Sequence, residues 1–207
     1  MSLEITELHL IKQIKHNAKL ILILRKNPIF NKIVENIISY FSNEFGENLD
    51  YKPIKTKKQF LDNYNLHDIA LNYITKQIKD KGFIICGLGK DLRKLSVEMK
   101  NEIPDLLVIN EEIIFSLDIK AKRSKKWFGK INKRAVNGYR KFRDSVSLID
   151  FKIPIYAQFI LMDENEPTDL LGYSNLSEVH IEENIEWDKN ITYKFNWKSG
   201  LVRIDGL

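Results

Sequence analysis

Two short apolar runs on either side of a polar turn predict a β-hairpin near the middle of the chain. The runs lie at 106–109 and 113–115 and are separated by two glutamates. A two-residue turn at the glutamates, or a four-residue loop over 110–113, sets Asp105 directly opposite Asp118, whereas a three-residue loop does not. Opposed residues have Cβ atoms roughly 5 Å apart, and like charges there destabilise a sheet unless something compensates them. We expect a divalent cation to do so. The same register predicts two further pairs, Ile109–Ile114 and Leu107–Ser116.

Lys120 lies two positions beyond Asp118, so the alternation of a β-strand places both side chains on one face of the sheet. Leu117, Ile119 and Ala121 then point to the other face. Two carboxylates and an ammonium group therefore converge at one end of the hairpin. Hard oxygen ligands of this kind suit Mg²⁺ or Mn²⁺.

Periodic segments flank the hairpin on both sides. Residues 65–81 carry apolar side chains at the spacing of an amphipathic helix that ends at Gly82, and residues 83–88 predict a buried strand. Residues 132–146 predict a second helix, and residues 153–162 a further strand. The order is helix, three strands, helix, strand, which predicts an α/β fold with a mixed sheet.

The sequence Pro104-Asp105 followed by Asp118-Ile119-Lys120 resembles the PD-(D/E)xK nucleases, which include restriction endonucleases and archaeal Holliday-junction resolvases. The resemblance covers about residues 65–162, and in size and its Lys-, Ile- and Asn-rich composition the chain is similar to members from spindle-shaped archaeal viruses. It implies a restriction-endonuclease-like αβββαβ core that hydrolyses phosphodiester bonds of DNA. By analogy with the family, a structure-specific role in junction resolution, recombination or repair is favoured over restriction, because the chain is small and has no evident sequence-reading module. A homodimer is expected because two sites are needed to cut both strands symmetrically.

The resemblance also assigns roles within the predicted site. Asp105, Asp118 and the carbonyl of Ile119 would bind Mg²⁺ or Mn²⁺, and Lys120 would position the attacking water or neutralise charge on the phosphate. Family members add an acid from the first helix, most often Glu. This helix has no Glu, and Asp68, with His67 beside it, is the nearest candidate.

Asp68 has an alternative explanation. If Asn65 caps the helix, Asp68 falls in its first turn, where an acid favours the helix dipole. The sequence does not decide between capping and metal binding. Glu35 and Glu98 are weaker candidates for the same role.

A long basic segment begins at the predicted site. Residues 120–143 contain eleven Lys or Arg and no Asp or Glu, while the whole chain has a net charge of only +5. Such a concentration beside a metal site indicates a phosphate-backbone partner whose binding weakens with salt. Trp127, Phe128 and Tyr139 could stack on unpaired bases or wedge into a junction, or Trp127 and Phe128 could simply anchor the loop to the core. We expect DNA to contact Lys122, Arg123, Lys125, Lys126, Trp127, Lys130, Lys133, Arg134 and Arg140.

The predicted core, residues 63–163, has an extension on each side. Residues 1–62 contain two helical segments, Ile11 to Arg25 and Pro28 to Phe45, the second capped by Asn27 and ended by Gly46. Residues 164–207 are acidic, and we expect them to extend the main sheet or to form a small β-appendage. Ile191, Tyr193, Phe195 and Trp197 alternate with polar residues as in a half-buried strand, and Val179 and Ile181 suggest its partner.

Several classes of function find little support. Cys86 is the only cysteine and lies in an apolar strand, which excludes disulfide frameworks within one chain, and the four histidines lack zinc-ligand spacing. The apolar run 20–24 is too short to cross a bilayer, and no cleavable signal precedes it, so we expect a cytoplasmic protein, within the host cell if it is viral. Two alternatives to a DNA nuclease remain: a non-catalytic DNA-binding protein of the same fold, and a nuclease acting on RNA.

Overall fold

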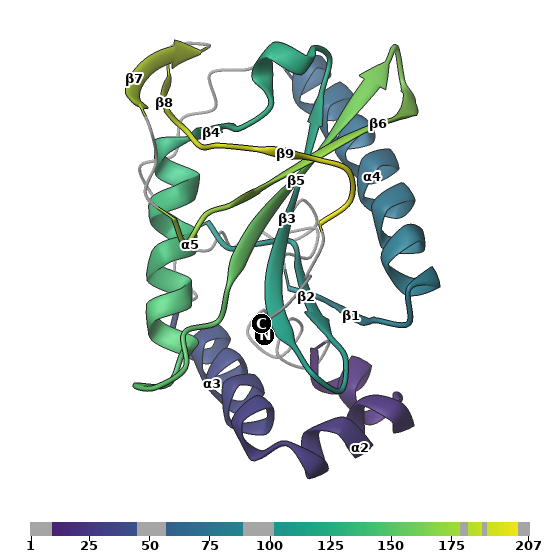
Figure 1. Ribbon diagram of the computed structural model, residues 1–207, viewed down its shortest axis with the longest axis vertical. Coiled ribbons are helices and arrows are strands. Elements are labelled where there is room, and N and C mark those ends of the chain that lie inside the picture. Colours follow the sequence, from purple (N-terminus) through teal and green to yellow (C-terminus); the bar gives the residue numbers. More distant parts are fainter. Residues whose placement is uncertain (1–9, 45–56, 89–101, 179–181, 188–189, 203–207) are drawn as a thin grey trace.

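The protein is an α/β structure in which helices cover both faces of a mixed β-sheet (Figure 1). The computed structural model describes residues 10–44, 57–88, 102–178, 182–187 and 190–202. The described helices are residues 10–15, α2 (Ala18–Lys26), α3 (Pro28–Glu44), α4 (Lys57–Asp80), the short 3₁₀ helix η2 (Lys125–Trp127) and α5 (Lys133–Val146). None of them has the length and apolar character needed to cross a membrane.

The main sheet has six strands in the order β1-β2-β3-β5-β6-β9. Their bounds are β1 (Ile84–Gly87), β2 (Leu106–Ile109), β3 (Ile114–Lys122), β5 (Ile155–Asp163), β6 (Glu166–Asn175) and β9 (Lys198–Ser199). β3 and β5 pair in parallel and are joined through α5, while the other neighbours are antiparallel. The predicted helices and strands are present as α4, β1, β2, β3, α5 and β5, but η2 and a short strand, β4 (Lys130–Asn132), lie between β3 and α5.

The predicted register of the hairpin is confirmed. Leu107 pairs with Ser116 and Ile109 with Ile114, across a four-residue connection. The side chain of Asn110 stabilises this connection, because its Oδ1 accepts hydrogen bonds from the backbone N–H groups of residues 112 and 113 at 2.9 and 2.8 Å. β2 begins at Leu106, so Asp105 lies one residue beyond the last paired position.

Alternation along the hairpin divides the core between two faces of the sheet. Leu106 and Val108 pack with the buried face of α4, including Ala70, Ile74 and Ile78. Leu107, Ile109 and Ile114 pack on the opposite face with α2, α3 and α5. Cys86 belongs to this second core, where burial raises the pKa of its thiol to about 11, in agreement with the predicted core role. Each fully buried aliphatic side chain contributes on the order of 1.5–3 kcal/mol, so α4 is held mainly by apolar contact.

Two predictions about helix boundaries were wrong. The segment 11–25 is not one helix, because Asn17 has an extended backbone and its side chain accepts a hydrogen bond from the N–H of Leu20 at 3.0 Å, which starts α2 anew. α4 begins at Lys57, well before Asn65, so Asp68 does not lie in its first turn and does not cap it. The predicted domain limit at residue 62 falls inside α4. The predicted cap of α3 at Asn27 is confirmed, and Gly46 lies outside the described residues.

The C-terminal region does both things that its pattern allowed. β6 and β9 follow β5, which ends at Asp163, and they extend the main sheet. β7 (Glu182–Trp187) and β8 (Asn190–Lys194) form a second sheet with β4 (Lys130–Asn132), in the order β4-β8-β7. Tyr193 and Phe195 are buried as predicted, but Ile191 is 45% exposed because β4 reaches only residues 192–194 of β8. Val179 and Ile181 lie outside the described residues.

Candidate active site

The site forms beyond the end of β2, where none of the described residues continues the strand pairing along this edge of β3. Asp105 occupies this place, and its Oδ2 accepts a hydrogen bond from the backbone N–H of Ile119 at 2.7 Å. The same oxygen lies 3.2 Å from Nε2 of His67, which reaches it from α4. Burial acts to raise the pKa of Asp105, but the contact with His67 and the charge of Lys120 outweigh burial and lower the pKa below its usual value.

Asp118 lies on the face of β3 that packs against α5. The hydroxyl of Tyr139 donates a hydrogen bond to its Oδ1 at 2.8 Å, and Nζ of Lys120 lies 2.8 Å from its Oδ2. The side chain of Asp118 is only 3% exposed. Burial and the nearby charge of Asp105 raise the pKa of Asp118 to about 6, although the Lys120 ammonium acts in the opposite direction. Its carboxylate is therefore held ionised chiefly by contacts within the protein.

Lys120 and Tyr139 complete a small polar cluster. Nζ of Lys120 donates a hydrogen bond to the Tyr139 hydroxyl at 3.1 Å, so this hydroxyl bridges the ammonium and Asp118. Burial acts to lower the pKa of Lys120, but the charges of Asp118 and Asp105 raise it above its usual value. Burial and the charge of Asp118 raise the pKa of Tyr139 well above its usual value. Lys120 thus carries its charge and Tyr139 its proton at neutral pH.

These contacts bear on the expectation that a divalent cation compensates the two opposed aspartates. Lys120 neutralises Asp118, and His67 pairs with Asp105, so groups of the chain itself compensate the like charges. Burial acts to lower the pKa of His67, but the bond to Asp105 and its charge raise the pKa above its usual value. The repulsion between Asp105 and Asp118 therefore does not by itself require a cation.

Asp68 does not contact Asp105 in the way expected of a third ligand. Its Oδ1 lies 3.7 Å from Nδ1 of His67, whereas Asp105 contacts the other ring nitrogen, Nε2. The imidazole of His67 therefore lies between the two carboxylates. Of the weaker candidates, Glu35 binds Asn31 and Lys32 on the surface of α3, and Glu98 lies outside the described residues.

α5 and the segment before β2 fix the geometry of the cluster together. Asn132 caps α5 by accepting a hydrogen bond from the N–H of Arg134 at 2.9 Å, so the helix begins one residue after its predicted start. Gly138 faces Glu102 so closely that an added Cβ would lie 2.8 Å from the Glu102 nitrogen and nearer still to its oxygen. Arg134 forms an ion pair with the Glu102 carboxylate. These contacts hold the residues preceding Asp105 against the helix that carries Tyr139.

The donor atoms suit a small hard cation in part. Among the described residues, none donates a well-aligned hydrogen bond to the buried Oδ2 of Asp118, which Lys120 approaches as an ion pair at 2.8 Å. Within the described part of the chain, both contacts of Asp105 use its Oδ2. Its Oδ1 is therefore available to a ligand. The carbonyl of Ile119 points to the same side of β3 as its N–H, toward Asp105. Among the described residues, however, no three His, Cys, Asp or Glu side chains gather closely enough to hold a metal ion.

The basic segment divides into buried and exposed parts. Lys122 is 6% exposed and donates to the carbonyl of Lys130 at 3.3 Å, and burial lowers its pKa to about 7. Lys133 and Arg140 lie over the ring of Tyr193, at 5.3 and 6.0 Å from its centroid. Arg134 is taken up by the ion pair with Glu102 described above.

The loop between β3 and β4 carries the exposed part. Arg123, Lys125 and Lys126 are exposed, and Lys130 is half-buried. Phe128 is 3% exposed and stacks on Phe159 with ring centroids 5.5 Å apart, so it anchors the loop to the core. Trp127 is half-buried and lies beside the Nζ atoms of two lysines.

Sequence reasoning missed two members of the cluster. Tyr139 was considered only as a residue that stacks on bases, although its place four residues after Ala135 and three before Phe142 puts it on the buried face of α5. His67 was noted only as the neighbour of Asp68. Helical spacing could have placed Tyr139 against the sheet, but no local pattern indicates which strand residue it meets. No protein-family model and no curated protein sequence matches the chain.

Proposed function

We propose that the chain is a metal-dependent nuclease that hydrolyses phosphodiester bonds of DNA. The observation that supports this most strongly is the buried cluster of Asp118, Lys120 and Tyr139 beside Asp105, at the edge of β3 beyond the end of β2. Charged groups are costly to bury and tend to mark functional sites, and the pKa of Asp118 is raised to about 6 in such a setting. The sequence resemblance to PD-(D/E)xK nucleases names the same three charged residues.

Each residue has a role that its contacts support. Asp105, Asp118 and the carbonyl of Ile119 would hold Mg²⁺ or Mn²⁺, and Asp68 would join them only if the imidazole of His67, which lies between Asp68 and Asp105, moved aside. When bound, such a cation supplies a Lewis acid for the phosphate and lowers the pKa of a bound water.

Lys120 keeps its proton and would turn from Asp118 toward a phosphate oxygen, where its charge stabilises the transition state. Tyr139 holds Asp118 in one orientation while the lysine moves.

The basic segment supports a nucleic acid as the substrate. It begins at Lys120 itself and continues into the exposed cations of the β3–β4 loop, so positive charge extends away from the cluster without interruption by acids in the sequence. Binding through such charges should weaken as the salt concentration rises, because the release of counterions from the phosphate backbone then contributes less to affinity. Because a symmetric cut of both strands needs two sites, we expect two copies to act together.

Cleavage assays with defined substrates test the proposal. Labelled linear duplex, single-stranded, flap and four-way-junction DNA, together with a single-stranded RNA, are incubated with Mg²⁺ or Mn²⁺. Asp118→Asn and Lys120→Ala should each lower the cleavage rate by about 10²–10⁴-fold. Lys79→Ala, which removes an exposed charge at the end of α4, is the matched control and should cleave as the wild type does.

A second candidate function follows from the charge balance of the cluster. Lys120 and His67 already compensate the two aspartates, which favours a protein that binds DNA and does not cut it. Salt-sensitive DNA binding without cleavage, and without uptake of Mn²⁺ in calorimetry, would establish this candidate and refute the nuclease. Preferential cutting of the RNA would keep the chemistry and change the substrate.

A further inference from the structure

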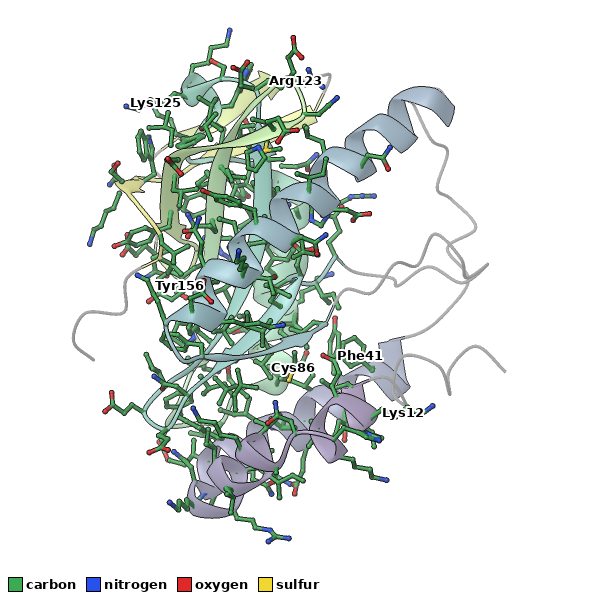
Figure 2. All side chains as sticks on the ribbon, turned by 90° about the vertical axis from the view of Figure 1, so that its right-hand side faces the viewer. Lys12, Phe41, Cys86, Arg123, Lys125 and Tyr156 are labelled. Carbon is green, nitrogen blue, oxygen red and sulfur yellow. The ribbon has the colours of Figure 1, made fainter. Side chains whose placement is uncertain are left out.

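We infer that the β3–β4 loop and Trp197 form a docking surface for unpaired nucleotides next to the cleavage site. The inference rests on the proposed function and names the part of the nucleic acid that this surface recognises. The loop surface is defined by Arg123, Lys125, Lys126, Trp127, Lys130 and Trp197. In Figure 2, Arg123 and Lys125 lie at the end of the molecule opposite α2 and α3.

Two indole rings and three lysines form the centre of the loop surface. Nζ of Lys130 and of Lys126 lie 4.8 and 5.5 Å from the centroid of the Trp127 ring. Nζ of Lys125 lies 5.4 Å from the centroid of the Trp197 ring. Both rings are half-buried, so each is partly accessible from solvent. Aromatic rings and cations interleaved in this way are the elements of single-strand binding surfaces.

The surface is fixed in place by the core beneath it. The ring of Phe128 packs edge-on against Trp197, with centroids 5.2 Å apart and planes at 77°. Gly172 on β6 makes room for both rings, because an added Cβ would lie 2.7 Å from Trp197 and 2.9 Å from Phe128. Gly129 has φ of +76° and its carbonyl accepts a hydrogen bond from the N–H of Phe195 at 2.9 Å. A surface that is already ordered loses little conformational entropy on binding.

The charges of the loop surface are available to phosphates. Within the described part of the chain, Arg123, Lys125, Lys126 and Lys130 form no ion pair with a carboxylate. The lysines instead lie against the rings, and a contact of this kind between exposed groups is weaker than base stacking. A base can therefore replace a lysine on the indole, while the lysine turns to the adjacent phosphate.

The aromatic rings favour unpaired nucleotides over a duplex. In a duplex each base is stacked between its neighbours, so its face is not open to a protein ring, whereas phosphates are open in both forms. The cations alone would bind either form, and the two indoles add affinity only for the unpaired one.

The loop surface begins where β3, the strand that carries Asp118 and Lys120, ends. At about 3.3 Å per residue, Lys122 at the end of β3 lies roughly 13 Å from Asp118. Nζ of Lys122 donates to the carbonyl of Lys130, which joins the end of β3 to the end of the loop. A strand cut at Asp118 would thus reach Lys122, where β3 ends and the loop begins, within about four nucleotides, taking the 3.4 Å rise of a stacked strand.

Binding without cleavage tests the inference separately from the proposed nuclease activity. Fluorescence anisotropy is measured with EDTA present, on labelled single-stranded and duplex DNA of equal length. Trp127→Ala should weaken single-strand binding by about 10-fold and duplex binding by less than about 3-fold. Trp127→Phe should retain most of the single-strand affinity. Lys76→Ala, an exposed charge on α4, is the control and should change neither.

The outcomes separate the two proposals. Equal losses on single strand and duplex, or no loss with Trp127→Ala in a folded protein, would overturn the inference while cleavage by the wild type still supports the nuclease. Selective loss of single-strand affinity in a protein that cuts nothing would establish the loop surface and refute the nuclease. Quenching of tryptophan fluorescence by single strands that is reduced in Trp127→Ala, with the remainder due to Trp197, would confirm the contact.

Discussion

Removal of one hydroxyl group, in Tyr139→Phe, should destabilise the protein in a manner that depends on pH. The hydroxyl donates to Asp118 at 2.8 Å and accepts from Lys120 at 3.1 Å, and the Tyr139 side chain is buried. Without it, Oδ1 of a buried carboxylate loses its donor. A hydrogen bond to a charged group contributes about 1.5–3 kcal/mol, so the free energy of unfolding at pH 8 should fall by about 2 kcal/mol. For a chain of this length that corresponds to roughly 4–8 °C in Tm.

The pH dependence follows from the raised pKa of Asp118. The folded pKa is about 6, compared with a usual value of 3.8, so at pH 5 the folded protein holds a neutral carboxyl group while the unfolded chain holds a carboxylate. A neutral hydrogen bond contributes only about 0.5–1.5 kcal/mol. The difference in unfolding free energy between wild type and Tyr139→Phe should therefore shrink to about 1 kcal/mol at pH 5. Urea denaturation at the two pH values measures it.

Tyr73→Phe provides a matched control. Its hydroxyl also donates to an aspartate, Asp169 at 2.8 Å, but in an exposed position where water replaces the lost partner. We expect the control to lose about 0.5 kcal/mol or less at both pH values. A Tyr139→Phe loss that is no larger than the control's, or that is the same at pH 5 and pH 8, would refute the assignment of a charge-assisted bond to Asp118.

Two further predictions concern the surroundings of the cluster. Gly138→Ala should cost about 1–3 kcal/mol of stability, because the new Cβ meets the backbone of Glu102; the exposed neighbour Asn137→Ala should cost nothing measurable in the same urea denaturation, and equal behaviour of the two would contradict the close approach. Lys122 has a folded pKa of about 7 against a usual value of 10.5, so the folded protein binds fewer protons than the unfolded chain between these values. Its stability should therefore rise with pH there, by up to about 2.7 kcal/mol between pH 7.5 and 9.5. Lys122→Met should remove that rise, and a rise that persists in the variant would show that another group causes it.

Local patterns predicted the elements of the fold well where side-chain period and turn chemistry agreed. The hairpin register followed from two apolar runs, and Asn110 stabilises the loop length that the register needs. The start of α5 was predicted to within one residue, although the capping role of Asn132 was not foreseen. The break at Asn17 was missed because apolar residues continue at helical spacing across it, so a single capping side chain decided the outcome.

The candidate site was predictable along the chain but not across the layers. Period-two alternation placed Asp118 and Lys120 together, because both lie on one strand. The contacts of Tyr139 and His67 depend on how two helices pack against opposite faces of the sheet, and no spacing in the sequence encodes those distances. For the same reason, the meeting of Lys125 with Trp197 from the acidic C-terminal region was not foreseen.

The alternation of side chains along β3 predicts which residues would be substituted first if selection for the proposed activity were lost. Leu117 and Ile119 belong to the core on the α4 side, whereas Asp118 and Lys120 lie on the other face. Joint replacement of the charged pair by apolar residues of similar volume would leave both layers packed and is often neutral or stabilising. Asp105 is different, because it accepts the bond from the Ile119 N–H and so closes the sheet edge. Relatives in which the proposed activity is no longer selected should therefore lose the pair first and retain Asp105 longest, because the fold depends on Asp105 alone among these three.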